Sequence, residues 1–312
     1  MRRLYVGLLA LEVLAGGFAF ADYNPYYDTA MADVLLRVVD DEGRPVGGAR
    51  VTAAFYINDT KTTGLTKETS EDGCIVAKYP CNGELKVWTR KDGYYDANFT
   101  TKSFITLTKA EASRTHKWSD GTVDIPVVLK KKRRPIELMR QDRQYWPFPA
   151  TNTVVSLDLE TLRWCPPYGE GRHADMNVLY EAEEHPEKGW HVSYWRRLTL
   201  SLPKVVDGVY CVKMDRGSQF PYVPVADTNA VFEKGLVFEV ERKNDRMVKK
   251  ALPAEGEYFI FRTRTATNEV GEVVRANYGR IGENLNLAIG LSIKAWFNPT
   301  PNDTNLEDAR AW

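Results

Sequence analysis

The chain has 312 residues, of which 42 are Lys or Arg and 42 are Asp or Glu, so its formal charge at pH 7 is zero. This balance argues against nucleic acid as a general partner, because nucleic-acid-binding domains usually concentrate basic residues on one face. The length exceeds that of one ordinary domain and predicts two.

The first residues have the pattern of a secretory signal peptide. Two arginines precede an apolar run over 4–11, and residues 19–21 form a small-x-small cleavage site before Asp22. This order is typical of a signal peptide. We therefore expect residues 1–21 to be removed and the mature protein to be exported, either periplasmic or extracellular. No later apolar stretch reaches the roughly 20 residues that a transmembrane helix needs.

Four cysteines are compatible with disulfides in an exported chain. Cys74 and Cys81 lie in the first half, and Cys165 and Cys211 lie in the second. Four cysteines allow three pairings. Pairing within each half is the most economical arrangement, but the sequence leaves all three open.

Short alternating segments fill the first half of the mature chain. Asn82 and Gly83 are typical of a two-residue hairpin turn. The polar segment 110–119 is expected to be a loop. The predicted strands cover 34–39, 49–57, 74–79, 84–90 and 123–129. Short strands separated by frequent turns favour a β-sandwich, and we assign residues 28–134 to a first domain that folds alone.

Three segments of this domain resemble a known family. They are 39–51, 69–73 and 91–95, which read VDDEGRPVGGARV, TSEDG and KDGYY. In this order they are similar to carboxypeptidase regulatory-like domains. The resemblance implies a seven-stranded sandwich of immunoglobulin or transthyretin type. It also implies an accessory module without catalytic residues.

A basic run marks the end of the first domain. Residues 130–134 are all Lys or Arg, and Pro135 follows them. Such a run is typical of a solvated linker, and the alternative is a contact with an anionic partner. We expect residues 135–149 to be a linker with a short helical turn over 136–143. Its aromatic and proline residues would pin the domains together or receive a ligand.

The segment 164–175 gathers residue types that could carry chemistry. Its two prolines and two glycines predict a rigid turn rather than a helix or central strand. One interpretation makes His173, Asp175 and Asp158 a metal or acid–base group. The other is a domain-entry corner in which His173 and Asp175 bond to turn backbone. No second histidine stands at a metal-ligand spacing, so we favour the corner.

Alternation continues through the second half, and no long segment has a helical period. Predicted strands cover 154–159, 176–180, 190–202, 236–241, 258–265 and 285–297. We therefore expect an all-β chain in which residues 150–312 form a second, larger sandwich of jelly-roll type. The segments 158–175, 276–281 and 296–307 resemble uncharacterised exported bacterial proteins. That likeness implies export and carries no mechanism over.

Two tryptophans are expected on the outer faces of these strands. Alternation places Trp195 outward together with His191 and Arg197, and it places Trp296 outward on the last strand. Large aromatic side chains on a polar face mark binding sites, and flat rings suit the apolar side of sugars. We predict that these four residues bind a ligand. The alternative is that a loop, the first domain or a partner subunit covers the two rings.

The sequence contains no recognised catalytic motif. The nucleophile elbow of serine hydrolases, the phosphate-binding loop and the dinucleotide-binding glycines are all missing. We predict no catalytic residue, no cofactor and no metal. Carboxylates that converge only in the fold stay open as a glycosidase site. The oxygen-rich segment 298–305 could hold calcium, but a proline-fixed loop explains it better.

These observations favour an exported, non-enzymatic binding or structural protein. Its expected partner is a glycan or another component of the cell envelope, and its oligomeric state is open. The alternatives are a carbohydrate-active hydrolase and a scaffold subunit of a surface assembly.

Overall fold

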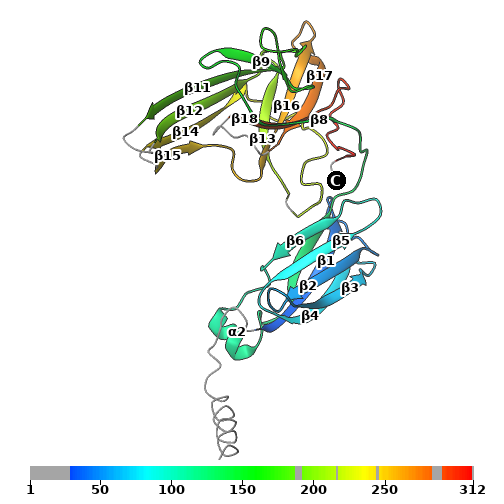
Figure 1. Ribbon diagram of the computed structural model, residues 1–312. Helices are drawn as coiled ribbons and strands as arrows, with labels where there is room; N and C mark the ends of the chain where they lie inside the picture. Colours follow the sequence, from blue (N-terminus) through cyan, green and yellow to red (C-terminus); the bar gives the residue numbers. More distant parts are fainter. Residues whose placement is uncertain (1–28, 187–191, 216, 244–245, 283–289, 311–312) are drawn as a thin grey trace, which may run out of the picture. The chain divides into compact units, whose positions relative to one another are not determined.

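The computed structural model describes residues 29–186, 192–215, 217–243, 246–282 and 290–310. The signal peptide predicted over 1–21 lies outside these ranges. The described backbone is almost entirely β, which confirms the predicted fold class (Figure 1). No helix in the described ranges is long and apolar enough to cross a membrane.

The chain divides into two compact units. The first unit consists of Met1–Lys131 with Gly217–Gln219, and the second consists of Lys132–Arg216 with Phe220–Trp312. Within the first unit, Ser218 forms a β-bridge with Ala97. Three residues from the second half of the sequence therefore extend the backbone pairing of the first unit.

The described part of the first unit is a sandwich of seven strands. A three-stranded sheet has the order β4-β1-β7, and a four-stranded sheet has the order β3-β2-β5-β6. The bounds are β1 Ala30–Asp40, β2 Arg50–Tyr56, β3 Thr62–Glu68, β4 Cys74–Cys81, β5 Leu85–Arg90, β6 Ala97–Thr101 and β7 Val123–Leu129. All neighbours are antiparallel except β1 and β7, which are parallel.

Alternating side chains form the core between these two sheets. On β1, Val34, Leu36 and Val38 are fully buried, and the residues between them are more exposed. On β2 and β5, Phe55 and Leu85 are also fully buried. The period-two pattern of the sequence thus corresponds to one inward and one outward row on each strand.

The predicted hairpin at Asn82 and Gly83 is wrong. The strand before it, β4, pairs with β1, and the strand after it, β5, pairs with β2 in the other sheet. Gly83 has a φ of 97°, so the sharp turn is present as expected. The turn joins two sheets instead of two neighbours, because residues far away in the sequence determine strand pairing.

The loop predicted over 110–119 contains a short helix, α2, over Lys109–Thr115. Its start is a capping box. The backbone N–H of Glu111 donates to Oγ1 of Thr108, and the backbone N–H of Thr108 donates to Oε2 of Glu111 at 2.9 Å. The Thr-x-x-Glu spacing was a readable helix-start signal. On the inner side of the helix, Ala112 packs into the hydrophobic core of the first unit.

The second unit contains two larger sheets. One has the order β10-β9-β11-β12-β14-β15, and the other has the order β13-β16-β17-β18-β8. The first set comprises β9 Val154–Asp158, β10 Arg163–Trp164, β11 Met176–Pro186, β12 Val192–Ser201, β14 Gly235–Lys243 and β15 Arg246–Ala251. The second set comprises β8 Met139–Trp146, β13 Gly208–Lys213, β16 Glu257–Thr267, β17 Val273–Ile281 and β18 Leu291–Phe297. Five of the nine neighbouring pairs are consecutive strands, and the other four are joined by longer connections.

The segment predicted as a linker over 135–149 contributes an edge strand. β8 pairs with β18 in antiparallel register, with Met139 opposite Phe297 and Trp146 opposite Leu291. The helical turn predicted over 136–143 is therefore also wrong. Most side chains of β8 are exposed, so the strand has no inward apolar row by which the sequence could reveal it.

Two layers of apolar side chains lie against the five-stranded sheet. Its inner face packs on the six-stranded sheet through residues such as Phe259, Phe261 and Ile293. Its outer face carries a second cluster that includes Tyr258 and Tyr278. This sheet is therefore covered on both faces.

Two irregular segments cover the outer face of the five-stranded sheet. They are 220–226 and 298–308, and they bond to one another through backbone pairs such as Ala226 N–H to Thr304 O at 2.8 Å. Val223 N–H donates to the hydroxyl of Tyr258 at 2.7 Å. We call these two segments the cover segments.

Candidate functional site

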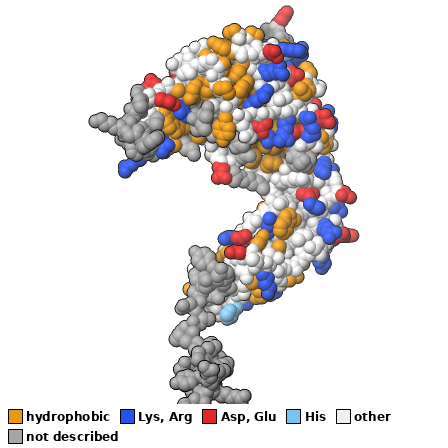
Figure 2. Space-filling view, in the orientation of Figure 1, with side chains coloured by type: hydrophobic (Ala, Val, Ile, Leu, Met, Phe, Trp, Pro, Cys, Tyr) orange, Lys and Arg blue, Asp and Glu red, His pale blue; other side chains and the backbone are white. Residues whose placement is uncertain are grey.

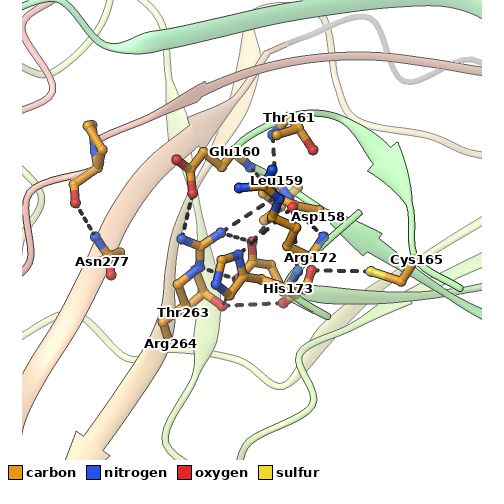
Figure 3. A network of polar contacts seen from close by, with 12 residues as sticks. Asp158, Leu159, Glu160, Thr161, Cys165, Arg172, His173, Thr263, Arg264 and Asn277 are labelled. Carbon is orange, nitrogen blue, oxygen red and sulfur yellow. Dashed lines mark hydrogen bonds and ion pairs between the residues drawn. The ribbon is translucent and has the colours of Figure 1, made fainter. Parts of the chain in front are cut away.

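A cluster of polar side chains forms where β9, the turn after it and the entry to β11 meet β16 (Figure 3). Asp158 ends β9, and Glu160 stands in the following turn. His173 and Asp175 precede β11, and Arg264 comes from β16. The structure therefore brings together the three residues that the sequence suggested as a metal or acid–base group. It adds Glu160 and Arg264 to them.

Asp158 is almost fully buried, and backbone donors surround its carboxylate. Oδ1 accepts hydrogen bonds from the N–H groups of Glu160 at 3.0 Å and Thr161 at 3.3 Å. Oδ2 accepts from Arg172 N–H at 2.9 Å and His173 N–H at 3.4 Å. Burial raises the pKa of Asp158, but these hydrogen bonds and the charge of Arg264 outweigh it and hold the pKa below its ordinary value.

Asp175 and Arg264 form a two-pronged ion pair. Nε of Arg264 donates to Oδ1 of Asp175 at 2.9 Å, and a terminal nitrogen of Arg264 donates to Oδ2 at 2.9 Å. Asp175 Oδ2 also accepts from the backbone N–H of Leu159 at 3.1 Å. Only 1% of the Asp175 side chain is exposed. A paired, charge-assisted geometry of this kind fixes both side chains in place.

Arg264 is shared by several groups. It donates to Glu160 Oε2 at 2.6 Å, and it lies 3.5 Å from Oδ1 of Asp158. Its guanidinium carbon is 4.5 Å from the ring centroid of Phe297. Burial lowers the pKa of Arg264, but the hydrogen bonds to Asp175 and Glu160 more than compensate and raise it above its ordinary value. Arg264 is therefore a fixed positive charge in the middle of three carboxylates.

Ligand atoms of Asp158, Glu160 and His173 lie within 4.8 Å of one another and could contact one metal ion. The guanidinium of Arg264 and the backbone donors already engage the carboxylate oxygens. His173 is half exposed, and its Nδ1 is 3.9 Å from Asp158. A metal would have to displace Arg264, so these contacts fit a structural clamp better than a metal centre.

The turn over 164–172 fixes this cluster by close backbone packing. A Cβ atom at Gly169 would lie 2.4 Å from the carbonyl oxygen of Trp164, so no larger residue fits there. The bond between Pro166 and Pro167 is cis. Cys165 Sγ donates to the carbonyl of His173 at 3.3 Å. Asp175 accepts from turn backbone, as the domain-entry corner expected, whereas the His173 side chain lies near Asp158 instead.

Trp195 lies on the outer face of the six-stranded sheet, as its position in the alternation suggested. Its ring is half buried, and Nε1 donates to Oε1 of Glu239 at 2.9 Å. Arg197 is on the same face and is also half buried. His191 lies outside the described residues. The predicted role of these three residues in ligand binding stays a prediction.

The expectation that Trp296 faces solvent is wrong, because only 3% of the residue is exposed. It does point away from the inner core, but the cover segments lie over it. Its ring centroid is 5.4 Å from that of Tyr222 and 4.5 Å from the guanidinium carbon of Arg280. The covering loop that the sequence analysis kept as an alternative is therefore what the structure contains. Trp296 has no open face for a ligand.

All four cysteines are free thiols, so the predicted disulfides do not form in the structure. Cys74 and Cys81 are at opposite ends of β4. A strand rises about 3.3 Å per residue, so their Cα atoms are far beyond the roughly 4.4–6.8 Å that a disulfide spans. Cys165 is buried beside the turn, and Cys211 is exposed on β13. Burial raises the pKa of Cys81 to about 11, which favours the unreactive thiol.

The oxygen-rich segment 298–305 bonds to its own backbone and to its neighbours. Asn298 Nδ2 donates to the carbonyls of Asp303 at 3.0 Å and Asn305 at 2.9 Å. Asn302 Oδ1 accepts from Ala276 N–H at 2.9 Å. These amides hold a cover segment in place, as the fixed-loop interpretation expected.

The sequence analysis did not single out two residues. They are Arg264, which joins the polar cluster, and Trp88, which lies on the outer side of β5. Nothing near Arg264 reveals its role, because its partner Asp175 is 89 positions away in the chain. Trp88 could have been found. It lies between the buried Val87 and Thr89 on β5, so the alternation that placed Trp195 outward also places Trp88 on the outer face of the first unit.

Comparisons with known proteins identify no family. No family model matches the chain, and no curated protein matches it. Wild-type catechol 1,2-dioxygenase of Acinetobacter radioresistens shares 15% identity over 34% of this chain, with a TM-score of 0.23. The match covers 54% of that enzyme, so the chain spans about half of its length.

Two pilins are similar over a larger share of the chain. A streptococcal ancillary pilin is 12% identical over 91% of this chain and 64% of its own, with a TM-score of 0.23. The major pilin subunit of Bacillus cereus is 12% identical over 89% and 100%, with a TM-score of 0.22. These scores are too low to carry an inference about what the chain binds or does.

Proposed function

We propose that this chain is an exported, non-enzymatic binding or structural protein whose second unit recognises a glycan. The recognition surface is the outer face of the six-stranded sheet around Trp195. The observation that carries this proposal is the fixed, half-buried indole of Trp195, held at 2.9 Å by Glu239 among charged cross-strand neighbours.

The neighbours of Trp195 supply hydrogen-bonding groups on both sides. Cross-strand partners share a face of a sheet. Trp195 is opposite Glu183 on β11 and Glu241 on β14, and Arg197 is opposite Glu181 and Glu239. Carboxylates accept hydrogen bonds from sugar hydroxyls, and an indole presents a flat apolar surface to the ring. The excess of carboxylates favours a neutral sugar over an anionic one.

The polar cluster around Arg264 supports a non-enzymatic role. Its carboxylates bond backbone N–H groups and one guanidinium, so they are committed to holding β9, β11 and β16 together. A catalytic acid or base needs a carboxyl group that can exchange a proton near neutral pH. The pKa of Asp158 is shifted below its ordinary value, away from that range.

The first unit is proposed to be a carboxypeptidase regulatory-like module that accompanies the glycan-binding unit. Its seven strands in two sheets support this assignment, which began with the segments 39–51, 69–73 and 91–95. Export is proposed from the signal-peptide pattern over 1–21.

A glycan array with the full mature chain tests the function, followed by titration of the strongest neutral glycan. Trp195→Ala should weaken that binding by about tenfold or more, on the scale of an aromatic hot spot. Trp195→Phe should keep part of the affinity because it keeps a ring. Thr199→Ala, on the same face of β12, is the matched control and should bind normally.

Each contrary outcome has a clear meaning. If no neutral glycan binds, or if Trp195→Ala binds as well as the unchanged protein, the proposed recognition surface is wrong. If a bound glycan is cleaved, the protein is a carbohydrate-active hydrolase. If native mass measurement shows an ordered assembly and no glycan binds, the protein is a scaffold subunit.

A further inference from the structure

We propose that the first unit carries a second ligand site, centred on Trp88, which binds a polysaccharide with carboxylate groups on its sugar rings. The site is on the outer face of the four-stranded sheet β3-β2-β5-β6. It goes beyond the proposed function because it lies on the other unit. Its charged groups are mainly basic, whereas carboxylates predominate around Trp195.

The outer face of this sheet contains an open groove of about 760 Å³ lined by Arg50, Thr52, Trp88 and Arg90. A second hollow of about 300 Å³ adjoins it and shares Trp88 and Arg90. Small-molecule sites typically have volumes of roughly 300–1,000 Å³. Figure 2 shows that this unit presents apolar side-chain surface next to basic and acidic side chains. The groove is thus large enough for a sugar unit and has an aromatic wall.

The strand register determines which groups surround Trp88. Trp88 is opposite Thr52 on β2 and Asn98 on β6. Lys86 is two residues before it on β5, and its Nζ is 4.6 Å from the centroid of the Trp88 ring. The indole is therefore flanked by hydroxyl, amide and ammonium groups. One face of a sugar ring can stack on the indole while its hydroxyls meet Thr52 and Asn98.

Two arginines stand directly opposite one another beside this indole. Arg50 on β2 is the register partner of Arg90 on β5. Like charges directly opposite each other destabilise a sheet. Arg90 is neutralised in part by Asp96, whose Oδ2 is 2.6 Å from its Nε. Among the residues that the structure describes, Arg50 makes no ion pair, although Glu68 is its register partner on β3. The excess positive charge is therefore centred on Arg50.

An anion between Arg50 and Arg90 would relieve this repulsion. A carboxylate suits the site because guanidinium groups bind carboxylates through paired hydrogen bonds. Arg90 is two residues from Trp88, which is about 7 Å along the strand. A sugar stacked on Trp88 can therefore place its own carboxylate, or that of the next sugar, between the arginines. A chain of such sugars accounts for an open groove better than a small free anion does.

The test titrates the full mature chain with polygalacturonate and with dextran as the neutral polymer. Binding to polygalacturonate should exceed binding to dextran at least tenfold and should weaken as salt is added. Trp88→Ala and Arg50→Gln should each reduce polygalacturonate binding about tenfold. Arg50 is exposed, and its removal relieves the repulsion with Arg90, so Arg50→Gln should melt no lower than the unchanged protein. This variant therefore keeps the test valid if Trp88→Ala is unstable.

Two matched controls separate this site from other effects. Arg114→Gln removes the same charge from α2 in the same unit and should change binding less than twofold. Trp195→Ala should weaken neutral-glycan binding about tenfold or more and leave polygalacturonate binding unchanged, so the two sites fail independently. Equal losses for Arg114→Gln and Arg50→Gln would show non-specific charge attraction and overturn the proposal. Equal binding of dextran and polygalacturonate by Trp195→Ala, which lacks the neutral-glycan site, or tighter binding of single-stranded DNA, would also overturn it.

Discussion

The four-stranded sheet of the first unit and the five-stranded sheet of the second carry an outward tryptophan in the same kind of position. Trp88 on β5 and Trp296 on β18 both point away from the core between the sheets. Trp88 borders an open groove, whereas Trp296 is 3% exposed beneath the cover segments. Alternation therefore tells which side of a sheet a residue occupies, but it does not tell whether that side is open.

The covered face contains a buried charge, which the open face lacks. Arg280 is fully buried, and its guanidinium carbon is 3.9 Å from the ring centroid of Tyr222. It donates to the carbonyl of Leu306 at 2.6 Å, so it links both cover segments to β17. Burial lowers the pKa of Arg280 to about 10. The cover segments are thus held by aromatic and cation contacts that a single strand pattern does not show.

The largest expected effect is a difference in the free energy of unfolding between the alanine variants of the two tryptophans. Trp296→Ala should destabilise the second unit by about 3–5 kcal/mol, as for other large core truncations. Trp88→Ala should change the stability of the first unit far less, because its ring is only half buried. Chemical denaturation of the two variants measures both values. Equal losses would mean that the two faces are equally covered and would break the comparison.

The next effect tests the clamp at the corner of the second unit. Arg264→Leu leaves the buried carboxylate of Asp175 without its partner, and we expect a loss of about 3 kcal/mol or more. The matched control is Arg163→Leu, which removes an exposed pair with Glu170 and should change stability by less than about 1 kcal/mol. Comparable unfolding free energies for the two variants would show that the clamp contributes little.

The acid stability of the second unit should depend on Asp158. Its folded-state pKa is depressed, so its contribution is fully present above its unfolded pKa of about 3.9. That contribution is lost as pH falls through the lower folded pKa, because the unfolded state binds the proton first. Glu160, Asp175, Arg264 and His173 are the charged or ionisable side chains around the same carboxylate.

The denaturant concentration at which half of the second unit is unfolded should therefore decrease as the pH is lowered from about 5 to 2. The amide of Asp158→Asn takes up no proton in this range, so the stability of this variant should fall less steeply with pH. A slope that is unchanged in Asp158→Asn would assign the acid sensitivity to other carboxylates.

The smallest stability effect belongs to the helix of the first unit. Thr108→Ala removes one half of the capping box of α2 and should cost about 1 kcal/mol. The second unit should be unaffected, so its unfolding transition serves as the internal reference. Hydrogen exchange at the start of α2 should increase, and unchanged exchange would show that the cap is unimportant.

Much of the fold could be predicted because the alternation of buried and exposed side chains along one strand is visible in a short stretch of sequence. Val34, Leu36 and Val38 alternate with more exposed residues, and Leu198 and Leu200 do the same on β12. Pairing and covering are not local. The turn at Gly83 is readable, but the choice of sheet for β5 depends on β2, which lies about 30 residues earlier, a non-local contact that no turn signal encodes.

The residues of the candidate sites also divide into those that the local sequence reveals and those that it does not. Asp158, His173 and Asp175 could be grouped in advance because they flank one turn-rich segment. Arg264 could not, because it reaches Asp175 from a strand far away in the sequence. The outward side of Trp296 was predictable, but the cover over it consists of irregular segments with no periodic pattern.

The central claim is that the open sheet faces bind ligands and the buried polar corner only holds the fold. One binding titration tests it most directly, using the strongest neutral glycan with the unchanged protein, His173→Asn and Trp195→Ala. We predict the same Kd for His173→Asn, because His173 is a half-exposed side chain at the corner. We predict a Kd at least about tenfold weaker for Trp195→Ala. If His173→Asn abolished binding while the fold survived, and Trp195→Ala bound normally, the corner would be the functional site and the account would be contradicted.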